Sequence, residues 1–310
     1  MATTHARGSI QHHELPARPQ GAPRPGRARR GGAAARMWRT SPLTFLTLVA
    51  AVALSIFPIY FMIVGATVGN DAIFKSPPPL VPGSRLIANL KAVFANTDAN
   101  LSKGLLNSLI ICSCVTLSVV FFSSLAGFAF AKLRFRGKNV MLLLILGSMM
   151  IPVQLGLIPL FIIMVKLGWE NHLAAVIVPF LINGFGVFLM RQYASQAIPD
   201  ELIEAARVDG ATTWGIYWRV VLPGLRPAAA VLGIFTFMQT WNDFLWPLVA
   251  MQDPENPTVQ ISLRSLGNGY YQDYSQVFAA TAVATVPLLI VFLVFGRQII
   301  GGIMEGAIKA

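Results

Sequence analysis

The sequence predicts an all-α integral membrane protein with six transmembrane helices. Apolar residues make up 55% of its 310 residues and charged residues only 12%, and the mean hydropathy is +0.62. A soluble domain carries about 25% charged residues, so half of that share together with long uncharged runs indicates spans in a bilayer. Six apolar segments are long enough to cross about 30 Å of hydrocarbon. They cover residues 43–66, 105–131, 139–165, 173–190, 228–250 and 277–296.

The first hundred residues divide into a tail and a first span with its loop. Residues 1–40 are rich in Arg, Pro, Gly and Ala and lack apolar periodicity, which predicts a disordered basic tail on the cytoplasmic side. The apolar stretch that follows is too long for a cleaved signal peptide. Residues 41–100 should hold the first transmembrane helix and a long extracytoplasmic loop with a short helix at about residues 87–94.

Prolines interrupt several of the predicted spans. A proline inside a helix removes one backbone hydrogen bond, so we expect each to kink its span or to open it locally. These prolines are Pro58, Pro152, Pro159, Pro179 and Pro287.

The distribution of Lys and Arg predicts that both chain ends are cytoplasmic. Of the 24 Lys and Arg residues, 18 fall in segments that lie inside under this orientation and 6 in segments outside. Cytoplasmic loops carry the excess of positive charge, and the sign of the asymmetry persists without the N-terminal tail. Residues 298–310 would then form a cytoplasmic C-terminal tail.

A polar island at residues 199–227 separates the fourth and fifth spans. Asp200 and Glu201 suit the first turn of a helix, and Gly210 suits its end. Thr212 or Thr213 can cap a second short helix, which Pro223 should stop. The sequence thus predicts two short helices joined at a glycine elbow outside the bilayer. Leu202, Ile203, Ala205, Ala206 and Val208 should form one apolar face of the first helix.

This island resembles the EAA loop of permease subunits of ABC importers. The resemblance lies in Glu-Ala-Ala, then Asp-Gly-Ala, then Leu-Pro about ten residues later. In that family the loop docks two short helices into a cleft on a cytoplasmic ATPase. The residues that would couple the chain to the ATPase are Glu204, Ala205, Ala206, Asp209, Gly210, Ala211, Leu222 and Pro223.

The resemblance extends over roughly residues 40–310 and implies a type I importer permease. Residues 101–297 would form its transmembrane domain of five helices with the coupling loop at about 199–227, and the nearest likeness is to the maltose-type second permease of carbohydrate importers. The implied partners are a second homologous permease, two cytoplasmic ATPase subunits, an extracytoplasmic solute-binding protein and membrane lipid. The chain itself would bind no cofactor, because ATP and Mg²⁺ belong to the ATPase. The location would be a bacterial or archaeal cell membrane.

One polar cluster lies inside the predicted fifth span. Asp243 is the one acid there, and a charge within a span usually faces a cavity or a partner. Amides, a carboxylate and indole rings provide the hydrogen bonds and stacking faces that a sugar requires. Packing between helices, with tryptophans as interfacial anchors, is the competing interpretation and stays open. The candidate pathway residues are Gln239, Trp241, Asn242, Asp243 and Trp246.

The remaining residues give no sign of catalysis, metal binding or nucleic-acid binding. No P-loop, Gly-x-Ser-x-Gly or His-Glu-x-x-His motif is present, so a non-catalytic subunit is expected. Cys112 and Cys114 lie in an apolar segment without a ligand partner. The leading hypothesis is half of the pore of an importer for a di- or oligosaccharide. The alternatives are a permease for glycerol phosphate or another polyol, and an ATP-independent transporter or channel, which would require charges in several spans.

Overall fold

The computed structural model describes residues 41–267 and 272–308, and the regular elements in these ranges are helices. The chain divides into two compact units, Met1–Ile56 and Phe57–Ala310. The described part of the first unit is residues 41–56, which belong to helix α2 (Pro42–Thr67). The predicted tail at residues 1–40 lies outside the described residues.

The first span and the helix in the loop after it are confirmed. Helix α2 covers the expected 43–66, and α3 (Asn70–Ile73) and α4 (Leu86–Ala95) follow, so the helix expected at 87–94 is present. The buried Asn89 fixes the start of this loop, because its Nδ2 donates to the carbonyl oxygens of Ala66 at 2.8 Å and Val68 at 2.9 Å.

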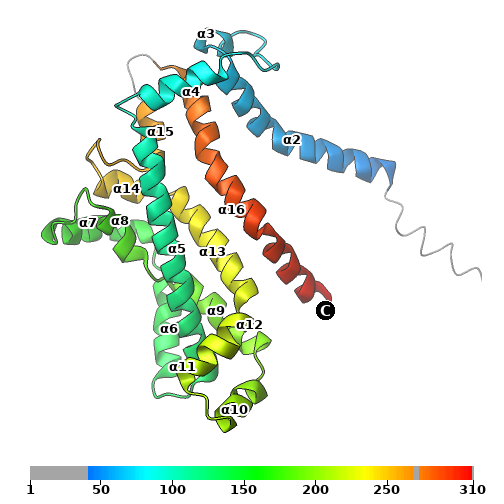
Figure 1. Cartoon of the computed structure of the whole chain (residues 1–310), viewed down its shortest axis with the longest axis vertical. Coiled ribbons are helices and arrows are strands. Elements are labelled where there is room, and N and C mark those ends of the chain that lie inside the picture. Colours follow the sequence, from blue (N-terminus) through cyan, green and yellow to red (C-terminus); the bar gives the residue numbers. More distant parts are fainter. Residues whose placement is uncertain (1–40, 268–271, 309–310) are drawn as a thin grey trace, which may run out of the picture. The chain divides into compact units, whose positions relative to one another are not determined.

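Helix α5 (Leu101–Lys132) is the central element of the second unit, where it packs against α9 (Gly184–Ala197), α13 (Arg226–Trp241) and α15 (Val259–Gly267) (Figure 1). The contact with α9 is close because Gly127 has no side chain: an added Cβ would lie 2.5 Å from the Cβ of Met190. Near the opposite end, Asn107 donates to the carbonyl of Pro257 at 2.9 Å. The hydroxyl of Ser108 accepts from the backbone N–H of Val259, also at 2.9 Å.

The third predicted span, 139–165, is broken. Helix α6 (Lys138–Ser148) and the segment formed by a 3₁₀ turn (Val153–Gly156) and α7 (Leu157–Lys166) meet at an angle of 89°. Pro152 lies at the break, where it lacks an N–H and disfavours a helical conformation for Ile151. The interruption expected at Pro152 is therefore confirmed.

The fourth predicted span, 173–190, extends to Ala197. It consists of α8 (Leu173–Ile177), a 3₁₀ turn (Val178–Phe180) and α9. Pro179 lies in the 3₁₀ turn. Asn183 then starts α9, because its side-chain oxygen accepts from the backbone N–H of Gly186 at 2.6 Å.

The fifth predicted span, 228–250, is not the single helix that we expected. Helix α13 ends at Trp241, residues 242–244 are non-helical, and α14 (Leu245–Ala250) follows. The cause is local, since the side chains of Asn242 and Asp243 bond to the backbone. Asn242 donates to the carbonyl of Met238 at 2.8 Å, and Asp243 accepts from the N–H of Trp246 at 3.4 Å.

The last helix, α16 (Tyr274–Ile308), contains the predicted span 277–296 and continues into the region expected to be a tail. Pro58 lies within α2 and Pro287 within α16, and both helices continue past their proline, so no break occurs at either. By length and composition, four helices in the described residues can cross a membrane, or up to six if each of two bent pairs is one span. The second bent pair, Thr213–Gly224 and Arg226–Trp241, meets at 74°.

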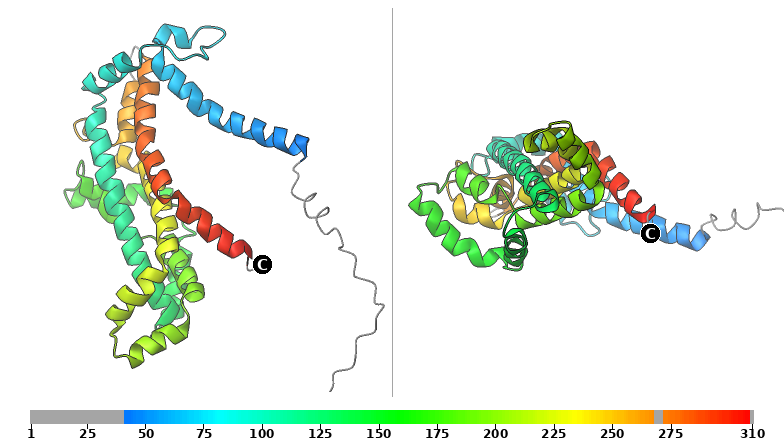
Figure 2. Two further views of the ribbon diagram at one scale, coloured as in Figure 1. Left: turned by 45° about the vertical axis from the view of Figure 1, so that its right-hand side comes forward. Right: turned by 90° about the horizontal axis from the view of Figure 1, so that it is seen from below.

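Two hydrophobic clusters hold the second unit together. One surrounds Val115, Phe128 and Tyr217 between α5, α9 and α13, and the other surrounds Val93 and Trp241 between α4, α13 and α16. Figure 2 shows α13 between α5 and α16, in agreement with their packing. The segment predicted to be the coupling loop, residues 199–227, lies at the end of this bundle opposite α4 (Figure 1).

Candidate functional site

The predicted loop begins with helix α10 (Asp200–Val208), which carries Asp200 and Glu201 in its first turn as expected. The residues predicted to form its apolar face differ in burial. Ile203 is 4% exposed, whereas Leu202 is 51% exposed and Val208 is 88% exposed. The helix therefore contacts the rest of the domain through Ile203 and Ala206 and leaves Leu202 and Val208 exposed.

The glycine elbow is confirmed. Gly210 has φ +78°, the left-handed conformation that favours glycine. The N–H of Gly210 donates to the carbonyl of Arg207 at 3.0 Å, and the N–H of Ala211 donates to that of Ala206 at 2.9 Å. This pair of bonds is the Schellman motif, which satisfies the last carbonyls of a helix and sets the direction of the chain after it.

The second arm of the loop is longer than predicted. Thr212 caps α11 (Thr213–Ile216), since its Oγ1 accepts from the N–H of Gly215 at 3.1 Å. A π-helical turn (Tyr217–Val221) and α12 (Leu222–Gly224) continue the same helix. Pro223 does not stop it. It lies one residue before the end of this helix at Gly224, and the turn into α13 follows Gly224 instead.

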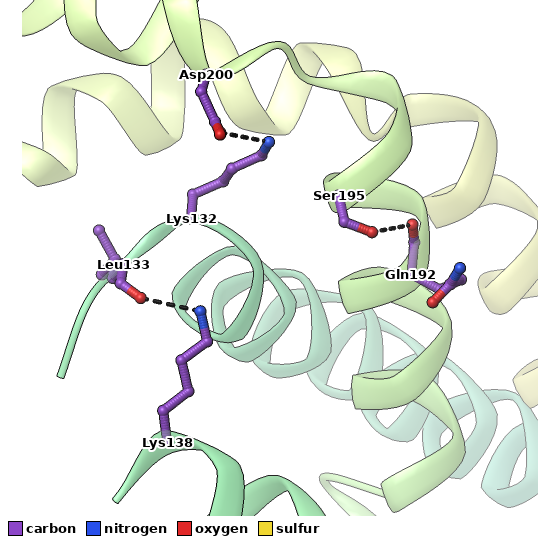
Figure 3. A network of polar contacts seen from close by, with 6 residues as sticks. All are labelled: Lys132, Leu133, Lys138, Gln192, Ser195 and Asp200. Atoms are coloured by element: carbon purple, nitrogen blue, oxygen red, sulfur yellow. Dashed lines mark hydrogen bonds and ion pairs between the residues drawn. The ribbon is translucent and has the colours of Figure 1, made fainter. Parts of the chain in front are cut away.

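An ion pair joins α10 to the end of α5. The Nζ of Lys132 donates to the Oδ1 of Asp200 at 2.7 Å, and the Lys132 side chain is only 7% exposed (Figure 3). The pKa of the Asp200 carboxyl lies below its ordinary value, first because Lys132 donates this hydrogen bond. The positive charges of Lys132, Arg134 and Lys138 lower it further. Sixty-eight residues separate the two partners, so sequence spacing alone gave no signal of this contact.

A buried hydrogen bond joins the second arm to α5. The hydroxyls of Tyr217 and Ser124 lie 2.8 Å apart, and the Tyr217 ring packs against Phe128 with centroids 6.1 Å apart. Tyr217 is fully buried. Both arms of the loop are thus attached to one helix, α5, and movement of the loop and of α5 is mechanically linked.

The predicted coupling residues fall into two groups. Ala206, Ala211 and Leu222 are half-buried and pack against the hydrophobic core. The others are exposed: Glu204, Ala205, Asp209, Gly210 and Pro223.

Four exposed apolar side chains of the loop were not among the predicted coupling residues. Trp214 and Trp218 pack one edge against Tyr217, yet all four side chains keep at least half of their surface exposed, and exposed apolar groups gathered in one loop indicate an interaction surface. The two tryptophans were detectable, because large aromatic side chains are uncommon in a solvated loop. The four residues are Leu202, Val208, Trp214 and Trp218, which are 51%, 88%, 57% and 51% exposed, respectively.

The structure separates the candidate pathway residues. Gln239 and Asn242 are exposed, and Asp243 is half-buried at the break between α13 and α14. The tryptophans are 1% and 2% exposed, and both indole N–H groups are engaged. Trp241 donates to Ala284 of α16 at 3.1 Å, and Trp246 donates to Ala175 of α8 at 3.0 Å. In this arrangement the tryptophans connect helices, while the three polar side chains remain within reach of solvent.

The described residues contain no group of three or more His, Cys, Asp and Glu side chains that could hold a metal ion. Cys112 is buried and Cys114 is exposed, and both are free thiols.

Comparisons with known proteins place this geometry in context. The model of a family described as "Binding-protein-dependent transport system inner membrane component" matches residues 120–302. An arabinooligosaccharide transport permease, AraQ of Halalkalibacterium halodurans, is 33% identical over 87% of this chain and 99% of its own. The lactose transport permease LacG of Rhizobium radiobacter is 34% identical over 86% of this chain and 95% of its own. The sn-glycerol-3-phosphate permease UgpE of Salmonella typhi is 31% identical over 83% of this chain and 94% of its own.

A solved structure shares the fold. A chain of a bacterial ABC transporter that imports the acidic polysaccharide alginate superposes with a TM-score of 0.73. The match covers 82% of this chain and 94% of that one at 21% identity, so it bears on architecture alone.

Proposed function

Because this chain belongs to the family of inner membrane components of binding-protein-dependent transport systems, we propose that it forms half of the translocation pathway of an ATP-driven sugar importer. It is a multi-pass permease subunit of an ABC transporter. The cargo is a di- or oligosaccharide, as the names of AraQ and LacG suggest. A homologous second permease completes the pathway, and an extracytoplasmic binding protein delivers the sugar.

The observation that carries the coupling role is the exposed surface of α10 and α11. The elbow at Gly210 fixes the angle between the two arms, and the contacts of Asp200 and Tyr217 attach both arms to α5. A rigid projection with exposed apolar side chains suits insertion into a complementary cleft. In our proposal that cleft belongs to a separate ATPase, which binds ATP and Mg²⁺ and performs the hydrolysis.

Substitutions on this surface test the docking. Ala205→Trp adds a large ring at an exposed position, and Glu204→Lys reverses a charge beside it. Overpacking at a fitted contact costs about 1–3 kcal/mol, so Ala205→Trp should reduce ATPase affinity about 5- to 150-fold. The matched control is Ala88→Trp, at an exposed alanine of α4 at the opposite end of the bundle.

The measurement is co-purification of the ATPase with each variant, together with hydrolysis stimulated by the binding protein in proteoliposomes. Loss in Ala205→Trp and Glu204→Lys, with retention in Ala88→Trp, supports docking through α10. Parental binding and transport in both loop variants would remove the basis for this role.

The cargo pathway is tested at the break after α13. Asp243 and Asn242 are the polar groups there that solvent reaches, and we propose that they line the route. Asp243→Asn should alter the uptake rate or sugar preference while the complex still assembles. Unchanged transport kinetics in several variants at the two positions would indicate that these residues only stabilise the non-helical break after α13.

A second candidate cargo is glycerol phosphate, because the relative UgpE is named for that substrate and is nearly as similar as the sugar permeases. Thermal-shift screening of the cognate binding protein against disaccharides, oligosaccharides and glycerol phosphate distinguishes the two. If glycerol phosphate alone stabilised the binding protein, glycerol phosphate and not a sugar would be the cargo.

A further inference from the structure

A cavity of about 600 Å³ lies between the coupling helix α10 and the connection from α5 to α6. Four cationic side chains line it, two of them from the ends of α5 and α6, one from the connecting loop and one from α10. Two carboxylates also line it. The charged residues are Lys132, Arg134, Lys138, Arg207, Asp200 and Glu204.

The cations in this cavity exceed their anionic partners. Lys132 is neutralised by Asp200 at 2.7 Å, and this is the only ion pair within 4.0 Å among the side chains of residues 41–267 and 272–296. Arg134, Lys138 and Arg207 therefore share a single remaining carboxylate, which forms no ion pair with any of them. The ammonium of Lys138 instead donates to the carbonyl of Leu133 at 3.1 Å, which holds it beside the end of α5 (Figure 3).

An unpartnered apolar surface begins where the cavity ends. Lys138 is the first residue of α6, and none of the residues of α6 is buried in this structure. Val140, Met141, Leu143 and Leu144 are between 51% and 69% exposed. A positive cavity followed directly by an exposed apolar helix matches the two parts of a phospholipid, whose phosphate and acyl chains are covalently joined.

We propose that this cavity binds the phosphodiester headgroup of an anionic phospholipid. Arg134, Lys138 and Arg207 surround the phosphate, and the acyl chains lie along the exposed face of α6. Guanidinium groups suit this role because they pair with phosphate oxygens through two hydrogen bonds. The bound lipid links the loop after α5 to the coupling helix, so the lipid composition of the leaflet affects how firmly α10 is held.

The test is lipid binding by the full-length chain purified in detergent, titrated with phosphatidylglycerol and followed by native mass spectrometry. Each cation that contacts the bound phosphate directly should contribute about a fivefold change in affinity for anionic lipid. Arg134→Gln and Lys138→Gln should each weaken phosphatidylglycerol binding about fivefold. Arg207→Gln, on a separate helix, should do the same and gives an independent variant if one of the others fails to fold.

The matched control is Arg136→Gln, which removes the same charge from the same loop at an exposed residue that does not line the cavity. It should leave phosphatidylglycerol binding within about twofold of the parent. An equal loss in Arg136→Gln, or no loss in the three cavity variants, would overturn the site, because binding would then reflect overall surface charge.

Two further titrations identify the source of the phosphate. Phosphatidylcholine should bind the parent more weakly than phosphatidylglycerol and should respond little to the substitutions. Inorganic phosphate should not displace phosphatidylglycerol at equimolar concentration, because it lacks the acyl chains that contact α6. Displacement at equimolar concentration would overturn the assignment to lipid in favour of a free anion.

Discussion

Replacement of Gly210 by valine isolates the contribution of the elbow between α10 and α11 to the proposed docking. A Cβ added at Gly210 would meet no atom within 4 Å, so steric exclusion by neighbouring residues plays no part. The cost arises only from the backbone, which at φ +78° lies in a region that L side chains rarely adopt. Such strain costs about 1–3 kcal/mol, and a β-branched residue lies toward the upper end.

The free energy of this strain is comparable to the free energy of the hydrogen bonds that maintain the elbow. The two capping hydrogen bonds, from Gly210 to Arg207 and from Ala211 to Ala206, contribute about 1 kcal/mol each. With valine in place of Gly210, strain of about 3 kcal/mol exceeds these two bonds by about 1 kcal/mol, so only about one molecule in six keeps the docking geometry. We expect apparent ATPase affinity to fall about sixfold, because it scales with the fraction of molecules in the binding-competent geometry.

The assay is titration of the purified ATPase onto the detergent-solubilised chain, with two controls. Gly210→Asn should stay near the parent, because asparagine tolerates the left-handed conformation. Gly215→Ala adds a Cβ at ordinary contact distance, 3.4 Å from the Oγ1 of Thr212, in a helical residue without positive φ. Parental affinity in Gly210→Val would show that docking does not depend on the angle at the elbow.

Three further outcomes are expected. Because Lys132 lowers the pKa of Asp200, the charged Asp200 carboxylate stabilises the fold at pH values above its ordinary pKa of 3.8. This contribution disappears as the pH falls through the lower pKa of the folded state. Thermal unfolding of Asp200→Asn and of the parent should therefore differ by a constant amount down to about pH 5 and converge in acid; a difference that grows in acid would contradict the pairing. Tyr217→Phe removes the buried bond to Ser124 and should lower the free energy of unfolding by about 1 kcal/mol, and an unchanged unfolding temperature would argue against that bond. A cysteine introduced at the exposed Ser76 should react with impermeant reagent only from outside the cell, and labelling only from the cytoplasm would invert the topology.

Features set by residues close in sequence were predictable. The elbow at Gly210, the cap at Thr212 and the interruption at Pro152 each depend on the backbone preference of one residue or its nearest neighbours. The family resemblance rested on the same local pattern and is confirmed by the match over residues 120–302. The role assigned to each loop residue stays a prediction.

Features that depend on distant partners or on competing local bonds were not predictable. Hydropathy continues through Phe244 and Leu245, so the break after Trp241 is invisible in the apolar pattern, although Asn242 and Asp243 cause it. The burial of the two tryptophans depends on carbonyls of α8 and α16. The π-helical turn at Tyr217–Val221, where the Tyr217 ring packs against Phe128 of α5, likewise had no signal in the sequence.

Helix α5 is continuous, and hydrogen bonds attach it to other elements near both of its ends. Its 32 residues extend about 48 Å at about 1.5 Å per residue, with no break along that length. Lys132 and Ser124 attach one end to the loop at residues 199–227, while Asn107 and Ser108 attach the other to the start of α15. An unbroken helix resists axial compression, so we expect a displacement applied at α10 to be transmitted along α5 to the start of α15.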